Sequence, residues 1–400
     1  MDNLLRDIQP QTIDLCIFDL IPSFLNIPFY FYYGNDAHDS DFMRAEQLRE
    51  SFYMALLEFP IIVGHLETDG SGHAKVVVDP DNLNIPEFLE SQSSVHFRDL
   101  RTANSLLDIM PEDRKALDDP TLELITTTGP LVRWLAWISP KTRGMLLNKA
   151  FSLMSVVGHT FHFSTSRLAS LRASVQGYLS SDVHLSDNDI LTALLSMVIA
   201  QSQAEYKRDS ASASYLSSLA SYLFPSMYEP DSSFVTQVVI DTRPRLKGLS
   251  AAKYTGNSVL TRCLVNSMES LTSGITEQSL APIAKGVRQL VNGVDSQYIG
   301  QYVDTLHKDL LRFMCPATYA FTKTTMLLSN QSRLPSYKAD FGNGIPTWVS
   351  SVRAFFPNFS SIMPAPPLTG GYVVYISMAE RAMAKLLQNE FWMSTNDMLY

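Results

Sequence analysis

The fold of this chain is organised around residues 186–201, which read SDNDILTALLSMVIAQ. Ser186 is a favoured N-cap, and Asp189 three residues later completes a capping-box pattern, so a strong helix is predicted to begin here. Within it, LTALLSMVIA is the longest apolar run of the sequence, yet it contains Thr and Ser and is shorter than the roughly 18 residues that a membrane span requires. The sequence therefore predicts no membrane span.

Strand-like and helix-like segments alternate along the rest of the chain, and most helices lie between strands. This order predicts a mixed α/β fold. The residues HFSTSRLASLRASV (162–175) indicate the end of a strand and then a helix capped by Ser164 or Thr165. Other strands are predicted at 28–33, 60–66, 74–79, 234–241 and 371–377, and other helices at 41–59, 279–292 and 296–313, with a last helix that Ser377 and Glu380 cap.

Composition limits the class of protein. A chain of 400 residues is too long for one ordinary core, so two domains are predicted. The net charge of −9, without any Lys/Arg block, leaves no electrostatic footprint for nucleic acid. The three cysteines are scattered and the eight histidines lack HExxH spacing, so no metal site is expected. The first residues include acids and no apolar segment of a signal peptide, which favours a cytoplasmic protein.

One stretch, FPIIVGHLETDGSG (59–72), has two interpretations. The spacing from His65 to Asp69 and Gly70 matches the signature of acyl-transfer enzymes in which a histidine is the general base. Asp-Gly is also the sequence of a tight hairpin turn, because Gly adopts positive φ without strain. The strand-like runs on both sides favour the hairpin.

Several stretches, in this order, resemble the BAHD acyltransferase family, above all the fungal branch typified by trichothecene 3-O-acetyltransferases. They are 52–79, 161–173, 186–201, 238–259, 337–346 and 366–387, so the resemblance spans nearly the whole chain. Within 337–346, YKADFGNGIP is similar to the family signature Asp-Phe-Gly-Trp-Gly. Asn343 replaces the Trp, at a position where the fungal branch varies.

The resemblance implies two domains, 1–178 and 179–400, each an α/β layer like that of chloramphenicol acetyltransferase, with a channel at their interface. The second domain would carry the DFGNG loop. The resemblance also implies a monomer with acyl-CoA as co-substrate, no bound cofactor, and a small hydrophobic alcohol as acceptor. His65 falls where the family has an arginine in its first hairpin, so the resemblance removes it as the base.

The family's catalytic segment is missing. Its His-x-x-x-Asp-Gly is expected between 122–130 and 161–164, but 131–144 resembles the helix that normally follows it, so the first domain is shortened near 130–160. His159 is the predicted substitute base, and His162 is the other histidine nearby; the opposing interpretation is a packing or solvent-exposed histidine.

Two functions follow from this departure. The first is coenzyme A-dependent O-acyl transfer to a hydroxylated secondary metabolite, with acetyl as the expected group. The second is a catalytically degenerate relative that binds or rearranges a hydrophobic metabolite without acyl-CoA.

The resemblance also assigns signature residues. Asp340 is expected to form a structural ion pair with Arg243, or less favourably Arg245, and the opposing interpretation gives it a catalytic role. Asn257 is either a turn residue or an oxyanion donor. The full set consists of Asp340, Phe341, Gly342 and Gly344 in the DFGNG loop, Arg243 in Arg-x-Arg, and Asn257 in Tyr-x-Gly-Asn.

Overall fold

The chain forms two compact units in a computed structural model. One unit comprises Met1–Leu124 and Pro335–Ser351, and the other comprises Ile125–Leu334 and Val352–Tyr400. The structure describes residues 5–16, 19, 29–35, 38–68, 74–90, 156–210, 233–246, 256–308, 325–351 and 358–399. The helix expected at 131–144 and the turn at Asp69–Gly70 lie outside these residues.

The division differs from the predicted boundary after residue 178. Strand β5 (Val156–Phe163) belongs to the second unit, because it pairs along its whole length with β11 (Tyr372–Ala379). Strand β9 (Trp348–Ser351), which follows the DFGNG loop, belongs to the first unit, because it pairs with β2 (Phe29–Tyr32). The DFGNG loop is therefore part of the first unit, rather than of a domain formed by 179–400.

The first unit contains an antiparallel sheet in the order β1-β4-β3, formed by Gln11–Asp14, Ala74–Val78 and His65–Thr68. Helix α1 (Ala45–Glu58) buries Tyr53 and Leu56 in a core shared with Val63 and Val78. The hairpin predicted around 60–79 is confirmed, since β3 and β4 are antiparallel partners. Residues Pro60–Val63 were predicted as strand, which is wrong: they form a 3-10 turn, η2, which begins at the proline because its fixed φ suits a helical first turn.

The second unit is built on a seven-stranded mixed sheet in the order β12-β5-β11-β10-β8-β6-β7. Strands β6, β8 and β10 are parallel, and β5 runs with them because β11 is antiparallel to both β10 and β5. The remaining strands are β12 (Asp397–Met398), β10 (Phe359–Pro364), β8 (Thr325–Asn330), β6 (Ser233–Asp241) and β7 (Val259–Ser267).

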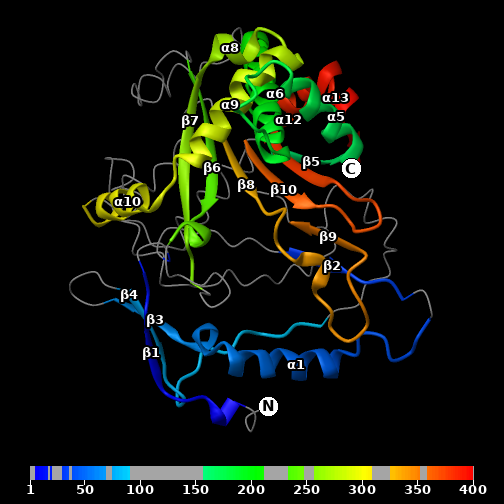
Figure 1. The fold of residues 1–400 in the computed structure, drawn as a ribbon. Helices are drawn as coiled ribbons and strands as arrows, with labels where there is room; N and C mark the ends of the chain where they lie inside the picture. The colour runs from blue at the N-terminus through cyan, green and yellow to red at the C-terminus, as the bar shows by residue number, and fades with distance from the viewer. Residues whose placement is uncertain are drawn as a thin grey trace. The chain divides into compact units, whose positions relative to one another are not determined.

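Helices α5, α6, α9 and α12 gather beside this sheet (Figure 1). Helix α6 is buried continuously from Asp189 to Ala200, which explains why its sequence is apolar all round. Its core includes Phe161 and Phe163 of β5, which meet the ring of Trp392 edge-on at 4.9 and 5.4 Å. The helices of this unit are α5 (Thr165–Gln176), α6 (Asp187–Ser210), α8 (Met268–Thr272), α9 (Glu277–Asn292), α10 (Ser296–Lys308), α12 (Glu380–Leu387) and α13 (Glu390–Thr395).

The mixed α/β prediction is confirmed, and so are the helix starts at Ser164 and near Ser186. The predicted cap at Ser377 is wrong: β11 continues to Ala379, which pairs with Val156, so the last strand delays the start of α12. Within the described ranges, no helix combines the length and hydropathy needed to cross a membrane.

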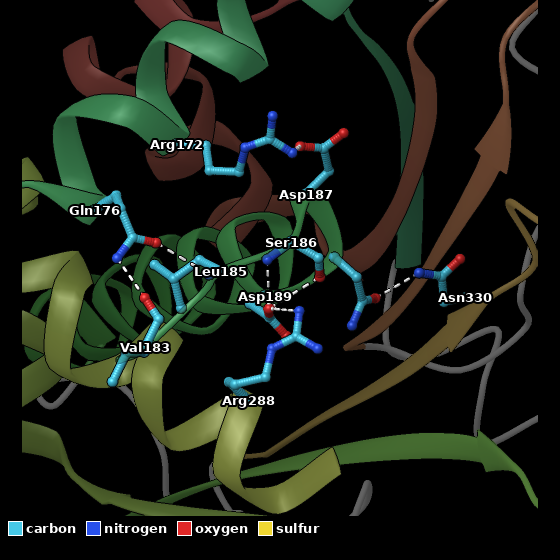
Figure 2. Close-up of polar contacts among 10 residues, drawn as sticks. Arg172, Gln176, Val183, Leu185, Ser186, Asp187, Asp189, Arg288 and Asn330 are labelled. Carbon is cyan, nitrogen blue, oxygen red and sulfur yellow. Dashed lines mark hydrogen bonds and ion pairs between the residues drawn. The ribbon is translucent and has the colours of Figure 1, made fainter. Parts of the chain in front are cut away.

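The start of α6 is fixed by the carboxylate of Asp189. Its Oδ2 accepts hydrogen bonds from the backbone N–H of Ser186 at 2.7 Å and from the Ser186 hydroxyl at 2.9 Å. It also pairs with the guanidinium of Arg288 on α9 (Figure 2). The Asp189 side chain is only 1% exposed, so its charge is compensated entirely within the protein. The capping pattern in the sequence thus also joins α6 to α9.

Replacing Asp189 by alanine is expected to destabilise the second unit strongly. The change leaves Arg288 unpaired and Ser186 without its acceptor, and breaking a buried ion pair on one side typically costs about 3–5 kcal/mol. Because Arg288 is 26% exposed, we expect the lower part of that range. Denaturant midpoints measure the loss. The matched control is Asp397→Ala, which breaks the exposed pair with Arg167 and should cost less than about 1 kcal/mol. Equal losses in both variants would contradict the assignment.

Candidate functional site

Four parallel strands of the second unit end at the same edge of the sheet. These strands are β5, β10, β8 and β6, and we call this end of the sheet the carboxyl edge. Helix α5 begins directly after β5, and side chains at the start of α6 bond to Asn330 and Tyr372 at the same edge. The carboxyl ends of parallel strands are where open α/β sheets bind ligands, so this edge is the first candidate for a functional site.

The start of α6 connects several elements at the carboxyl edge. Asp187 accepts a hydrogen bond from Nη1 of Arg172 on α5 at 2.6 Å and another from the hydroxyl of Tyr372 at 3.3 Å. Asn188 accepts from the side-chain amide of Asn330, the last residue of β8 (Figure 2). Burial, reinforced by the nearby Asp187 carboxylate, raises the pKa of Tyr372 above its usual value, so the phenol stays protonated and donates.

Arg243 and Arg245 lie in η6 (Arg243–Arg245), immediately after β6. Arg243 pairs with Asp241 at 3.0 Å and donates to the carbonyl of Gly256 at 2.7 Å. Arg245 donates from Nη1 to the carbonyls of Val291 and Val294, both at 2.8 Å, at the end of α9. A cation there is favourable because a helix C-terminus carries partial negative charge. Both arginines therefore hold backbone together at this edge.

Asn257 lies in a segment that contacts the arginine segment, a proximity that the sequence did not predict. Its neighbour Ser258 accepts from the backbone N–H of Thr242 at 2.8 Å, and the hydroxyls of these two residues lie 2.5 Å apart. Asn257 is half-buried in the segment that this contact holds. Its role as turn residue or oxyanion donor stays a prediction.

His159 and His162 lie on opposite faces of β5. His159 is in the middle of the strand, opposite Ile376, and its ring is 6.5 Å from that of Phe161, which packs into the helix-covered core. It is half-buried within the strand, whose pairing with β11 begins at Val156, so it is not solvent-exposed; its role as a base or a packing histidine stays a prediction. Three positions later, His162 points to the other face.

His162 is bonded to a glycine turn at the carboxyl edge. Its Nε2 is 2.9 Å from the carbonyl oxygen of Gly370. Gly370 and Gly371 have φ of 66° and 82°, values that favour glycine. A Cβ on Gly371 would lie 2.0 Å from the carbonyl oxygen of Phe163, so only glycine lets this turn approach the end of β5 so closely.

The DFGNG loop of the first unit is folded around Asp340. Its Oδ1 accepts from the backbone N–H groups of Gly342 at 2.8 Å and Gly344 at 3.0 Å. These two glycines have φ of 97° and 91°, which explains why both positions are glycine. Asn343 uses its side-chain oxygen to accept from the backbone N–H of Met43 at 3.1 Å. The loop is therefore attached to the segment before α1.

Phe341 is 49% exposed, and its ring meets that of Tyr33 edge-on with centroids 5.9 Å apart. The hydroxyl of Tyr33 donates to the carbonyl of Ala339 at 2.7 Å. Burial and the nearby Asp340 carboxylate raise the pKa of Tyr33. These contacts give Asp340 a local structural role. Arg243 lies in the other unit, so the expected Asp340–Arg243 ion pair stays a prediction.

The sequence matches the model of a known protein family. The Transferase family matches residues 161–392, more than half of the chain. The chain belongs to this family, the BAHD acyltransferases. The match begins at the FHFS end of β5 and ends at Trp392 of the core, so it includes the carboxyl edge. No curated protein sequence matches the chain.

Solved structures share the BAHD fold at low sequence identity. TRI101 of F. graminearum with ethyl coenzyme A is 15% identical with a TM-score of 0.65, covering 98% of this chain and 100% of that one. TRI101 of F. sporotrichioides with coenzyme A and T-2 is 16% identical with a TM-score of 0.62 and the same coverage. Vinorine synthase is 14% identical with a TM-score of 0.60, covering 96% of this chain and 94% of that one.

Sequence reasoning missed several residues at the carboxyl edge of this BAHD chain. Tyr372, Arg172 and Gly370 were not predicted to take part in any site, although the Gly-Gly pair before the last predicted strand was a signal for a tight approach. Within the described part of the chain, no cluster of His, Cys, Asp and Glu is placed to hold a metal ion.

Variants of Asp340 distinguish its local role in the BAHD loop from the predicted ion pair. Asp340→Asn retains an oxygen that can accept from Gly342 and Gly344, whereas Asp340→Ala removes it. We expect alanine to destabilise the first unit by about 1 kcal/mol and to accelerate amide exchange at the two glycines. Asparagine should stay near wild type in thermal unfolding and hydrogen exchange. If asparagine is as damaging as alanine, the charge itself matters and pairing with Arg243 is favoured.

Proposed function

We propose that this protein transfers an acyl group, with acetyl as the expected group, from a coenzyme A thioester to a hydroxyl group of a hydrophobic secondary metabolite. The observation that carries the proposal is membership of the BAHD family, together with a fold that matches TRI101 over nearly the whole chain. TRI101 of F. graminearum has been crystallised with coenzyme A and T-2 mycotoxin. We propose the same ligand class for this chain, a thioester donor and a hydroxylated acceptor.

The charges of the carboxyl edge support an anionic co-substrate. Arg333 lies three residues after β8 and is exposed. Burial is the main effect: it lowers the pKa of Arg245 and raises the pKa of Tyr372. The positive charge of Arg333 lowers the pKa of both groups. Cations close enough to repel one another attract anions, and coenzyme A carries several phosphate charges. Arg333 is therefore the side chain that we expect to meet the co-substrate.

The reaction requires a proton acceptor. The acceptor oxygen attacks the thioester carbonyl carbon, a C–O bond forms, the C–S bond breaks, and the hydroxyl proton must leave. A general base contributes about 10²–10⁴ in rate, while positioning two substrates together contributes up to roughly 7–11 kcal/mol. Because 131–160 lacks the family's His-x-x-x-Asp-Gly, this chain needs another base or reacts slowly.

Incubation with acetyl-CoA and a panel of hydroxylated terpenoids and polyketides tests the proposal. We expect acceptor-dependent thiol release, with the ester identified by mass spectrometry. His65→Ala should leave turnover near wild type, because His65 lies in the first hairpin, where the family has an arginine and not its base. A fall of about a thousandfold in a folded His65 variant would mean that the base had been misplaced.

The missing motif also favours the second candidate, a relative that binds a hydrophobic metabolite without acyl transfer. It predicts thiol release at background for every acceptor, together with measurable binding of a metabolite from the same panel by calorimetry. Acceptor-dependent release above background excludes it.

A further inference from the structure

The imidazole of His162 has its tautomer fixed by the backbone. Nε2 lies 2.9 Å from the carbonyl oxygen of Gly370, and a carbonyl oxygen can only accept a hydrogen bond. Nε2 therefore carries the hydrogen. In the neutral ring, the other nitrogen, Nδ1, then carries the lone pair and can accept a proton.

This lone pair is open to a ligand. Nδ1 of His162 has no hydrogen-bond partner among the residues that the structure describes, and His162 is only half-buried. Nδ1 of His162 is not among the buried polar atoms that lack a partner in that part of the chain. An atom that is neither bonded nor buried is accessible, so Nδ1 can reach a proton donor without first breaking a protein contact.

The strand that carries His162 is paired on both sides, and one backbone carbonyl orients the ring. Its strand, β5, pairs with β11 at Val373 and with β12 at Asp397, whose carboxylate is bonded to Arg167. The carbonyl that orients the ring belongs to the Gly370–Gly371 turn, which glycine alone allows to lie against the end of β5. A base oriented by a second group is the usual arrangement of an enzyme's proton acceptor.

His159 differs from His162 in the face of β5 that it occupies and in its position along the strand. It lies on the face of β5 that carries Phe161 and Phe163, whose rings pack beneath the helices. It is in the middle of the strand, opposite Ile376, whereas His162 lies near the carboxyl edge, next to the Gly370–Gly371 turn.

We propose that Nδ1 of His162 is the proton acceptor of the acyl transfer, an inference that rests on the proposed function. As the acceptor oxygen forms its bond to the thioester carbonyl carbon, its proton moves to Nδ1. When the tetrahedral intermediate collapses, the C–S bond breaks and the departing sulfur takes the proton from the imidazolium. The products are the ester and the free thiol, and His162 returns to the neutral Nε2–H form.

Chemical modification tests the accessible lone pair without relying on turnover. Diethyl pyrocarbonate acylates imidazole nitrogens that are unprotonated and exposed. With the full-length protein, peptide mass spectrometry should find His162 modified at least about tenfold faster than His159. The reason is that Nδ1 of His162 is both unprotonated and accessible. Nitrogen-15 spectra of labelled protein should show His162 with the hydrogen on Nε2. An unmodified His162, or a hydrogen on Nδ1, overturns the proposal whatever the activity.

His162→Gln tests the catalytic role. A glutamine amide can still donate to the Gly370 carbonyl but cannot accept the proton, so kcat should fall by about 100-fold or more. The KM for acetyl-CoA should change by no more than about twofold, because a base lowers the barrier and does not bind the ground state. The matched control is His65→Gln, since His65 also bonds a backbone carbonyl through Nε2 and should retain wild-type turnover.

The outcomes separate the two proposals. A wild-type protein without acceptor-dependent thiol release overturns the proposed function, and the catalytic role of His162 with it. Robust wild-type release that survives His162→Gln overturns the role of His162 alone. The role of His162 is also overturned if His159→Gln abolishes release and His162→Gln does not. Unfolding curves for each variant show whether a loss of kcat comes from loss of the fold.

Discussion

The buried carboxylate of Asp189 is the contact on which the second unit depends. A charge removed from water must be balanced inside the protein, and here Ser186 and Arg288 balance it. The Asp189–Arg288 pair therefore fixes the position of the start of α6 relative to α9. The neighbouring residues Asp187 and Asn188 then tie α5, β11 and β8 to the same point. The carboxyl edge owes its geometry to the first turn of one helix.

Sequence patterns predicted the elements whose formation is local. The capping pattern at Ser186 and the apolar run after it located α6, and the turn residues predicted the hairpin of β3 and β4, although the first strand was placed too early. They could not assign the elements to units, because this depends on pairing between distant segments. The contact between Met43 and Asn343, for example, joins residues 300 positions apart. The same is true of β5, whose partner β11 lies near the end of the chain.

Only part of the candidate site could be found from the sequence. Motif order singled out Arg243 and Asn257, but it did not show that the paired strands β6 and β7 bring their segments together. It did not show that Arg245 caps α9, since the carbonyls of Val291 and Val294 have no sequence signature. The choice between His159 and His162 depends on which face of β5 the helices cover. Strand alternation puts the two on opposite faces, and only tertiary packing decides which face is which.

The burial of α6 has a consequence for synthesis of the chain on the ribosome. One side of this helix is covered by α12, and the core around it includes Trp392, and both are made long after α6 itself. Strand β5 likewise waits for β11 and β12. Until the C-terminal segment emerges, the apolar surface of α6 and one edge of β5 lack their partners, a state that favours aggregation. The second unit therefore cannot complete its folding until α12 and Trp392 have been made, and the nascent chain depends on protection until then.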